Sequence, residues 1–143
     1  GPLTLADEVG IDIADEVSST LGAAFPTRLS VPQILKRMVI SGSLGRKTGK
    51  GFYDHTVAGE KKPHAELALT FSRGAREFTS EELERRMVLT MVNEAARCLE
   101  EGIVETPADV DFGMVTGTGW APFRGGPLRY ADSLGVDQVA NGP

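Results

Sequence analysis

Cysteine and histidine are scarce in this 143-residue sequence, and their scarcity excludes several kinds of site. The one cysteine, Cys98, cannot form an internal disulfide, and such sparing use of cysteine suits a reducing compartment. The two histidines, His55 and His64, lie in a polar stretch and have no sequence-defined partner, so solvated side chains are the favoured interpretation. One cysteine and two scattered histidines predict no metal-ligand cluster.

Positive charge and long apolar runs are also lacking. The balance of 15 basic and 20 acidic residues gives a net charge of −5, which argues against nucleic acid or an anionic membrane as the main partner. No apolar run approaches the ~20 residues of a membrane helix. The N-terminus has neither the basic nor the apolar region of a secretion signal. The sequence therefore predicts a soluble intracellular protein with no membrane span.

Neither glycine-rich segment has the spacing of a nucleotide-binding loop. A phosphate-binding loop needs glycine, four residues, then Gly-Lys-Ser/Thr, but Gly49-Lys50 is followed by Gly51. The second segment places Pro122 where a dinucleotide fingerprint needs a small residue, and no predicted strand precedes it. We therefore predict no cofactor-binding, catalytic or metal-binding residue in this chain.

What the sequence does contain is an internal repeat. Its first twelve residues, GPLTLADEVGID, return at a constant offset of 125 as GPLRYADSLGVD, with seven identities. A chain that begins and ends on the same motif is expected to hold the closing half of one copy and the opening half of another. The repeat predicts two incomplete tandem copies, over residues 1–53 and 79–143, with a linker over 54–78.

Helical periodicity runs through both predicted copies, and no strand–helix–strand alternation occurs, so we predict an all-α fold. In the helix after Asp12, which we expect to be the cap, Ile13, Val17 and Leu21 predict one buried face. Thr79 and Glu82 have the spacing of a capping box at the start of a long helix. The predicted helices are 3–9 with Gly10 as a left-handed stop, 12–24, 30–42, 65–77, 79–102, whose core face carries Met87 and Met91, and 106–115.

Few polar residues stand out as candidates for a functional site. Asp7 and its repeat Asp132 are interpreted as structural caps or salt-bridge partners. Three cations, Arg46, Lys47 and Lys50, could contact the phosphates of an anionic ligand, although bracing of their loop is favoured. The rigid segment with Trp120, Pro122 and Phe123 is expected to pack in a core or an interface rather than line a pocket.

Four strings together resemble the paired C-terminal helical domains of 3-hydroxyacyl-CoA dehydrogenases, as in the multifunctional α subunit of the fatty-acid oxidation complex. They are GPLTLADEVGID, LGRKTGKGFYD, VNEAARCLEEGIVETPADVD and GTGWAPFRGGPLRYADSLG. The resemblance covers nearly all of residues 1–53 and 81–137. It implies a helical bundle of the 6-phosphogluconate-dehydrogenase C-terminal-domain type.

The same resemblance implies a function. The parent would oxidise an L-3-hydroxyacyl-CoA with NAD in β-oxidation, and its Rossmann domain and His–Glu dyad would precede residue 1, so this fragment by itself is expected to be inactive and to bind no NAD. The family's G-P-x turn implies that Gly1, Pro2 and Leu3 line the substrate cleft. The implied partners are acyl-CoA, the Rossmann domain, a hydratase domain and a thiolase subunit. The implied location is the cytoplasm in bacteria, and the mitochondrial matrix or peroxisome in eukaryotes.

Two alternatives remain open. The chain could be a free-standing helical module that docks on a separate Rossmann or thiolase subunit. It could also belong to another hydroxyacid dehydrogenase of the 6-phosphogluconate type, which the paired G-P-L motifs do not favour. In the preferred interpretation the incomplete copies pair with each other or dimerise to cover apolar stripes such as Ile34, Leu35 and Met38.

Overall fold

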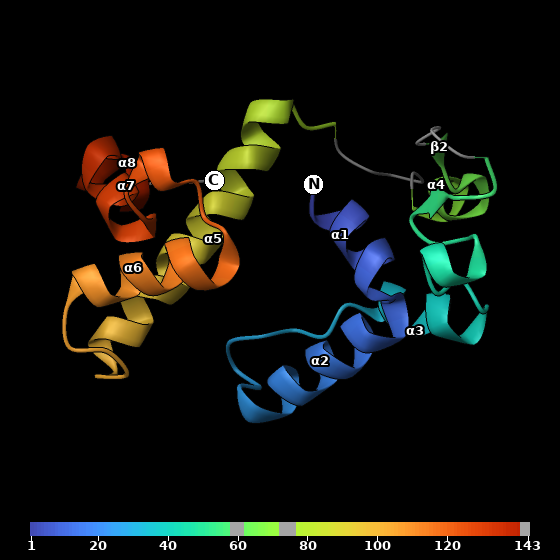
Figure 1. Ribbon diagram of the computed structural model, residues 1–143, viewed down its shortest axis with the longest axis horizontal. Helices are drawn as coiled ribbons and strands as arrows, with labels where there is room; N and C mark the ends of the chain where they lie inside the picture. The colour runs from blue at the N-terminus through green and yellow to red at the C-terminus, as the bar shows by residue number, and fades with distance from the viewer. Residues whose placement is uncertain (58–61, 72–76, 141–143) are drawn as a thin grey trace. The chain divides into compact units, whose positions relative to one another are not determined.

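The computed structural model describes residues 1–57, 62–71 and 77–140, which fall into two compact units, Gly1–Ala75 (unit 1) and Arg76–Pro143 (unit 2). Their elements follow one another along the chain as Figure 1 shows, and the described part is mainly helical, which confirms the all-α prediction. Unit 1 contains α1 (Pro2–Val9), α2 (Ile11–Ala24), α3 (Gln33–Ile40), the 3₁₀ turn η1 (Arg46–Thr48), β1 (Tyr53–Asp54), β2 (Lys62–Pro63) and α4 (Ala65–Phe71). Unit 2 contains α5 (Ser80–Glu100), α6 (Pro107–Thr118), the 3₁₀ turn η2 (Pro122–Arg124), α7 (Pro127–Leu134) and α8 (Val136–Ala140).

The core of unit 1 is small and is made where α2 packs on α3. Ile11, Leu35 and Met38 are buried there, and Phe52 and Leu67 pack against them from the following segments. The apolar stripe of α3 thus has the partner helix that its spacing requires.

The predicted buried face of α2 is wrong. Ile13, Val17 and Leu21 are each more than two-fifths exposed, and Ile11 at the start of the helix is the buried residue. Asp12 does not cap this helix, because Gly10 occupies the cap position and the Asp12 carboxylate binds Lys47. Gly10 has φ 111° and ψ 130°, so it stops α1 in a glycine conformation other than the predicted left-handed one.

Unit 2 is built on the long helix α5, and the predicted capping box at its start is confirmed. Thr79 Oγ1 accepts from the Glu82 amide at 3.1 Å, and the Thr79 amide donates to Glu82 Oε2 at 2.8 Å. A second box, formed by Thr106 and Asp109, begins α6. These reciprocal bonds satisfy amides that a helix start otherwise leaves unpaired.

Only part of the predicted apolar row of α5 packs inward. Ala95 of that row and the flanking Val92 are buried, whereas Met87 and Met91 of the same row are 47% and 39% exposed. The i+4 row is continuous in the sequence, but α6 and α7 cover only part of it. Periodicity identifies an apolar stripe but not how much of it has a partner.

Part of the stretch predicted as a linker is folded onto unit 1. β1 pairs antiparallel with β2, with Tyr53 opposite Pro63, and α4 carries Leu67 against the unit 1 core. The structural break between the units falls at residues 75–76, inside the predicted 54–78 range. The predicted break of the fourth helix at Gly74 lies outside the described residues. That the two units are two incomplete tandem copies stays a prediction.

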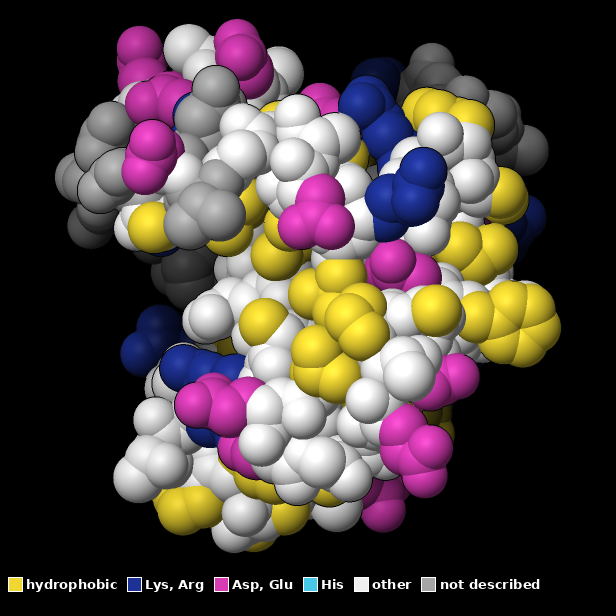
Figure 2. Space-filling model, turned by 90° about the vertical axis from the view of Figure 1, so that its left-hand side faces the viewer, with side chains coloured by type: hydrophobic (Ala, Val, Ile, Leu, Met, Phe, Trp, Pro, Cys, Tyr) yellow, Lys and Arg dark blue, Asp and Glu magenta, His cyan; other side chains and the backbone are white. Residues whose placement is uncertain are grey.

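Many large apolar side chains are exposed in this chain. Figure 2 shows hydrophobic side chains gathered in patches on one face, among acidic and basic groups. Of the described helices, none is long and apolar enough to cross a membrane.

Candidate functional site

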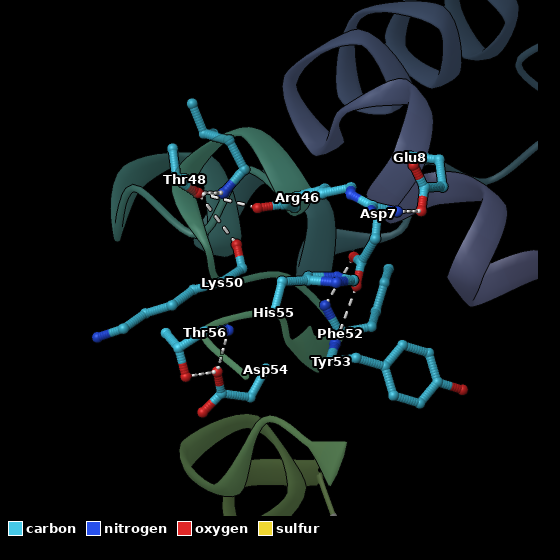
Figure 3. Close-up of polar contacts among 12 residues, drawn as sticks. Asp7, Glu8, Arg46, Thr48, Lys50, Phe52, Tyr53, Asp54, His55 and Thr56 are labelled. Carbon is cyan, nitrogen blue, oxygen red and sulfur yellow. Dashed lines mark hydrogen bonds and ion pairs between the residues drawn. The ribbon is translucent and has the colours of Figure 1, made fainter. Parts of the chain in front are cut away.

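The first copy of the repeat is organised around one buried carboxylate, that of Asp7 in α1. Asp7 is 1% exposed, and its Oδ1 accepts from the Phe52 amide at 2.8 Å. Its Oδ2 accepts from the Tyr53 amide at 3.0 Å and lies 2.8 Å from His55 Nε2. Figure 3 shows these groups converging on the carboxylate. Asp7 therefore joins α1 to the segment that follows η1, in the structural role predicted for it.

Glycine makes this close approach possible. A Cβ on Gly51 would overlap the Asp7 carboxylate, and one on Gly45 would overlap the Asp7 main chain. Gly45 also has φ 94°, a conformation that other residues rarely adopt. Gly45 and Gly51 are thus required by the backbone geometry around Asp7.

His55 is held in place, and its predicted solvation is wrong. Its side chain is 17% exposed and contacts a carboxylate that is fully buried. The two residues are 48 positions apart, so no local motif indicates the pair. The buried carboxylate, which already has two amide donors, takes its third from this imidazole.

The three predicted phosphate-contacting cations sit on the outside of the same loop. Arg46 Nη1 lies 2.5 Å from Glu8 Oε1, and Lys47 Nζ lies 2.5 Å from Asp12 Oδ1. Both ion pairs connect η1 to the α1–α2 segment, which is the bracing role. The Lys50 side chain extends away from Asp7 in Figure 3. Contact between these residues and a phosphate stays a prediction.

Two carboxyl groups of this region have lowered pKa values. The side-chain hydrogen bond from Lys47 holds the pKa of Asp12 below its ordinary value. The hydroxyl and amide of Thr56 bind Asp54 and hold the pKa of that carboxyl below its ordinary value. Both groups are thereby ionised down to lower pH than in an unfolded chain.

The buried Asp7 carboxylate with its three partners, Phe52, Tyr53 and His55, is called the Asp7 clamp. An apolar pocket of about 630 Å³ opens beside it in unit 1. Pro2 and Leu3 of the G-P-L turn contribute to its lining, whereas Gly1 is not among the lining residues. One polar atom in the wall, His64 Nδ1, is buried and has no hydrogen-bond partner. His64 was interpreted as solvated, and the burial of its Nδ1 differs from that interpretation because a polar stretch of chain gives no sign of burial. The lining residues are Pro2, Leu3, Ala6, Ala14, Pro32, Ile34, Leu35, Phe52, Tyr53, Pro63, His64 and Leu67.

The second copy of the motif has a different arrangement. Asp132, the repeat of Asp7, is exposed, and a different carboxylate, Asp111 of α6, contacts the motif. Asp111 accepts from the amides of Leu128 at 2.8 Å and Arg129 at 3.1 Å. A Cβ on Gly126 would overlap Asp111, so glycine is needed here as well. Asp111 therefore caps α7 from a neighbouring helix.

Trp120 and Phe123, which lie in the turn before α7, differ in their exposure to solvent. The Trp120 and Tyr130 rings lie 6.3 Å apart, and the Arg124 guanidinium lies 5.1 Å from the Tyr130 ring centre. Phe123 is 84% exposed. Trp120 thus packs within unit 2, which agrees with the predicted core role. The Phe123 side chain is exposed.

Within residues 1–57, 62–71 and 77–140, no group of acidic, histidine or cysteine side chains could hold a metal ion. The region around Asp7 combines a buried carboxylate held by two amides and His55, the ion pairs of Arg46 and Lys47, and an apolar pocket bordered by the unpaired His64 Nδ1. This arrangement can fix a helix and a loop and can enclose apolar groups.

A family model described as "3-hydroxyacyl-CoA dehydrogenase, C-terminal domain" matches residues 1–55 and 84–142. The two matched segments contain both copies of the repeat and end on either side of the break between the units. The chain belongs to the family of 3-hydroxyacyl-CoA dehydrogenase C-terminal domains.

Similar proteins extend the comparison to one kind of enzyme subunit. The chain is 40% identical to the fatty acid oxidation complex subunit alpha of Colwellia psychrerythraea over 96% of its length, and 41% identical to that of Shewanella amazonensis over 97%. It spans 20% of the length of each of these relatives. The dehydrogenase part of multifunctional enzyme 1 from C. elegans has the same fold, with a TM-score of 0.66 at 31% identity, over 99% of this chain and 33% of that one.

Proposed function

We propose that this chain forms the substrate-cleft and oligomerisation portion of an NAD-dependent L-3-hydroxyacyl-CoA dehydrogenase of fatty-acid β-oxidation. The observation that carries the proposal is the family match over both copies of the repeat, together with relatives that are α subunits of fatty-acid oxidation complexes. The chain spans a fifth of those subunits, so the activity belongs to the longer protein.

NAD would be the parent's oxidant, accepting the hydride that leaves the hydroxyl carbon. The described residues of this chain do not fit that cofactor, because the glycine-rich turn before η2 follows a helix and has Pro122 where the dinucleotide loop needs a small residue. We assign NAD and the proton-accepting dyad to a separate Rossmann domain of the parent, and no catalytic residue to this chain.

The role proposed for this chain is positional. Asp7 fixes α1 to the loop after η1, and α1 begins with the G-P-L turn at the apolar pocket. Gly1, Pro2 and Leu3 are proposed to face the acyl part of the substrate, which an apolar wall suits. Arg46, Lys47 and Lys50 are the proposed contacts to its phosphates.

Partners follow from the same proposal. They are the Rossmann domain, a hydratase domain, a thiolase subunit and a second copy of the α subunit. The bacterial relatives favour a cytoplasmic location.

The proposal is tested by comparing this chain with its parent. Purified full-length parent should oxidise NADH in the presence of acetoacetyl-CoA, and the isolated chain should not. In the parent, Leu3→Asp should raise KM for a long acyl-CoA about tenfold or more, with Leu5→Asp as the matched control on the same helix. Turnover by the isolated chain, or equal effects of the two substitutions, would contradict these roles.

The rival proposal is a free-standing module that docks on a separate Rossmann or thiolase subunit. The exposed apolar side chains favour it, because an interaction module needs such a surface. A reading frame that continues upstream of Gly1 into a dinucleotide fingerprint would eliminate it.

A further inference from the structure

Unit 2 contains an apolar groove of its own, with a volume of about 370 Å³, which we call the α5–α6 groove. It is bordered by the second half of α5, by the connection between α5 and α6, and by α6. Its wall is almost entirely apolar, so the groove suits an apolar occupant. The apolar part of the wall includes Met91, Ala95, Cys98, Ile103, Val110 and Met114.

The groove continues an apolar row that runs along α5. Met91 lies in the groove, and Met87 and Leu83, one and two turns before it, are exposed. The helix rises by roughly 18 Å between Leu83 and Ala95. An apolar row of that length beside an open groove is a surface on which a further helix can pack, because the side-chain ridges of one helix fit into the grooves of another.

Methionine is concentrated on this surface. Of the four methionines in the chain, Met91 and Met114 line the groove and Met87 continues its row, whereas Met38 is buried in the core of unit 1. The methionine side chain is unbranched and adapts to irregular neighbours, and it is common on surfaces that bind amphipathic helices. The composition of the groove is therefore typical of a binding surface.

Negative charge surrounds the groove. Between Glu94 and Asp111 the sequence has six acidic residues and one basic residue, Arg97. Two of the acidic residues, Glu94 and Asp109, border the groove itself. Charge of one sign around a docking surface favours a partner of the opposite sign and disfavours a partner of the same sign. Symmetric pairing of two copies of this chain at the groove would bring two acidic rims together, so it is the less favourable occupancy.

From these observations we infer that the α5–α6 groove and the row through Met87 dock a basic amphipathic helix of another protein. The apolar face of that helix would enter the groove, and its Lys or Arg side chains would face Glu94 and Asp109. Helix-in-groove binding of this kind uses apolar anchors at i, i+3, i+4 and i+7 of the bound helix. The surface lies wholly in unit 2, and the inference does not depend on the proposed activity.

Two glycines of α6 provide a matched pair of variants. Gly113 lines the groove, and a Cβ on it would meet nothing within 4 Å. Gly117, one turn further along α6, has the same open space but is not among the lining residues. Gly113→Leu therefore adds a side chain at the groove, and Gly117→Leu adds the same side chain away from it. Both variants should keep the fold, because leucine has a higher helix propensity than glycine, and circular dichroism checks this.

The probe is a synthetic helical peptide of about 14 residues, long enough to cover the row, with leucine along one face and lysine beside it. Its charge-reversed control has glutamate in place of lysine. Binding of each peptide to the complete 143-residue chain is measured by calorimetry. Cys98 gives a second readout, since it is the one cysteine of the chain and lines the groove, so its rate of reaction with a maleimide reports occupancy.

The lysine peptide should bind the unmodified chain and Gly117→Leu equally, slow the labelling of Cys98, and bind more weakly at high salt. Gly113→Leu should weaken binding about tenfold or more. Equal binding by the two variants, equal binding of the two peptides, or the absence of saturable binding would overturn the inference. Concentration-dependent protection of Cys98 without peptide would also overturn it, because the occupant would then be a second copy of this chain.

Discussion

The two copies of one twelve-residue motif have complementary partners. In α1, the aspartate in the middle of the motif is buried by the loop that follows it in the chain, and the helix start is open. In α7, the helix start is capped by a helix that precedes it, and the middle aspartate, Asp132, is exposed. Each copy of the motif thus makes contacts that the other copy does not make. The same residues are buried or exposed according to which neighbouring segment is present.

The largest difference between the two copies is expected at the aspartates in the middle of the motif, Asp7 and Asp132. Asp7→Ala removes three hydrogen-bond partners and leaves two backbone amides unpaired, so unit 1 should lose about 3–5 kcal/mol. Asp132→Ala should change unit 2 by less than about 0.5 kcal/mol, because the side chain is exposed. Urea unfolding measured by circular dichroism checks both, and fluorescence of Trp120 follows unit 2 separately. Equal losses would contradict the different roles assigned to the two aspartates.

Gly51→Ala tests the close approach of the loop to Asp7. A Cβ at this position overlaps the carboxylate, and moving either group weakens the clamp, so we expect a loss of about 1–3 kcal/mol. Gly113→Ala is the matched control, since a Cβ there meets nothing and lies within α6. The free energy of unfolding of that control should rise by about 0.5–1 kcal/mol, because alanine has a higher helix propensity than glycine. Thermal unfolding of the two variants should therefore shift in opposite directions.

Asp111→Ala sharpens the comparison at the start of α7. The hydrogen bonds that the Leu128 and Arg129 amides donate to this half-buried carboxylate are lost. We expect the free energy of unfolding of unit 2 to fall by about 1–2 kcal/mol and that of unit 1 to stay unchanged. Trp120 fluorescence during urea unfolding gives the unit 2 value. An effect on the Asp7 clamp, seen as faster exchange of the Phe52 amide, would show coupling between the units that the comparison does not include.

The smallest effect is expected at the Lys47–Asp12 pair, and it depends on pH. Because the pKa of Asp12 is lowered in the folded state, the pair stabilises unit 1 above the carboxyl's unfolded pKa of about 3.9. This stability is lost as pH falls through the lower, folded pKa. Lys47→Met should therefore lower the melting temperature near about pH 6, and this difference should shrink as the pH falls below about 3.9. A difference that persists in acid would mean that packing of the lysine stem dominates.

Local patterns predicted the parts of the fold that depend on neighbouring residues. The Thr79–Glu82 capping box and the helix predicted from Thr106 are read from local sequence alone and were confirmed. The structural role of Asp7 followed from its recurrence. Its partners did not, because the loop amides and His55 lie more than forty positions away and only the fold brings them near.

Burial was predicted less well than helix positions. The rows through Val17 of α2 and Met87 of α5 have helical periodicity but are largely exposed. A periodic row shows where a partner could pack, and burial requires that the partner is present. The burial of the His64 Nδ1 atom has no local signal, because the surrounding residues are polar in composition.

Asp7 also gives α1 a mechanical role. The G-P-L turn and the clamped aspartate lie on the same two-turn helix, which is too short to bend appreciably between them. A load applied at Gly1 is therefore transmitted as a rigid displacement to the Phe52 and Tyr53 amides, where the carboxylate is anchored. In a pulling experiment from the N-terminus, α1 should resist until this anchor ruptures, and the loop after η1 should then release in the same step.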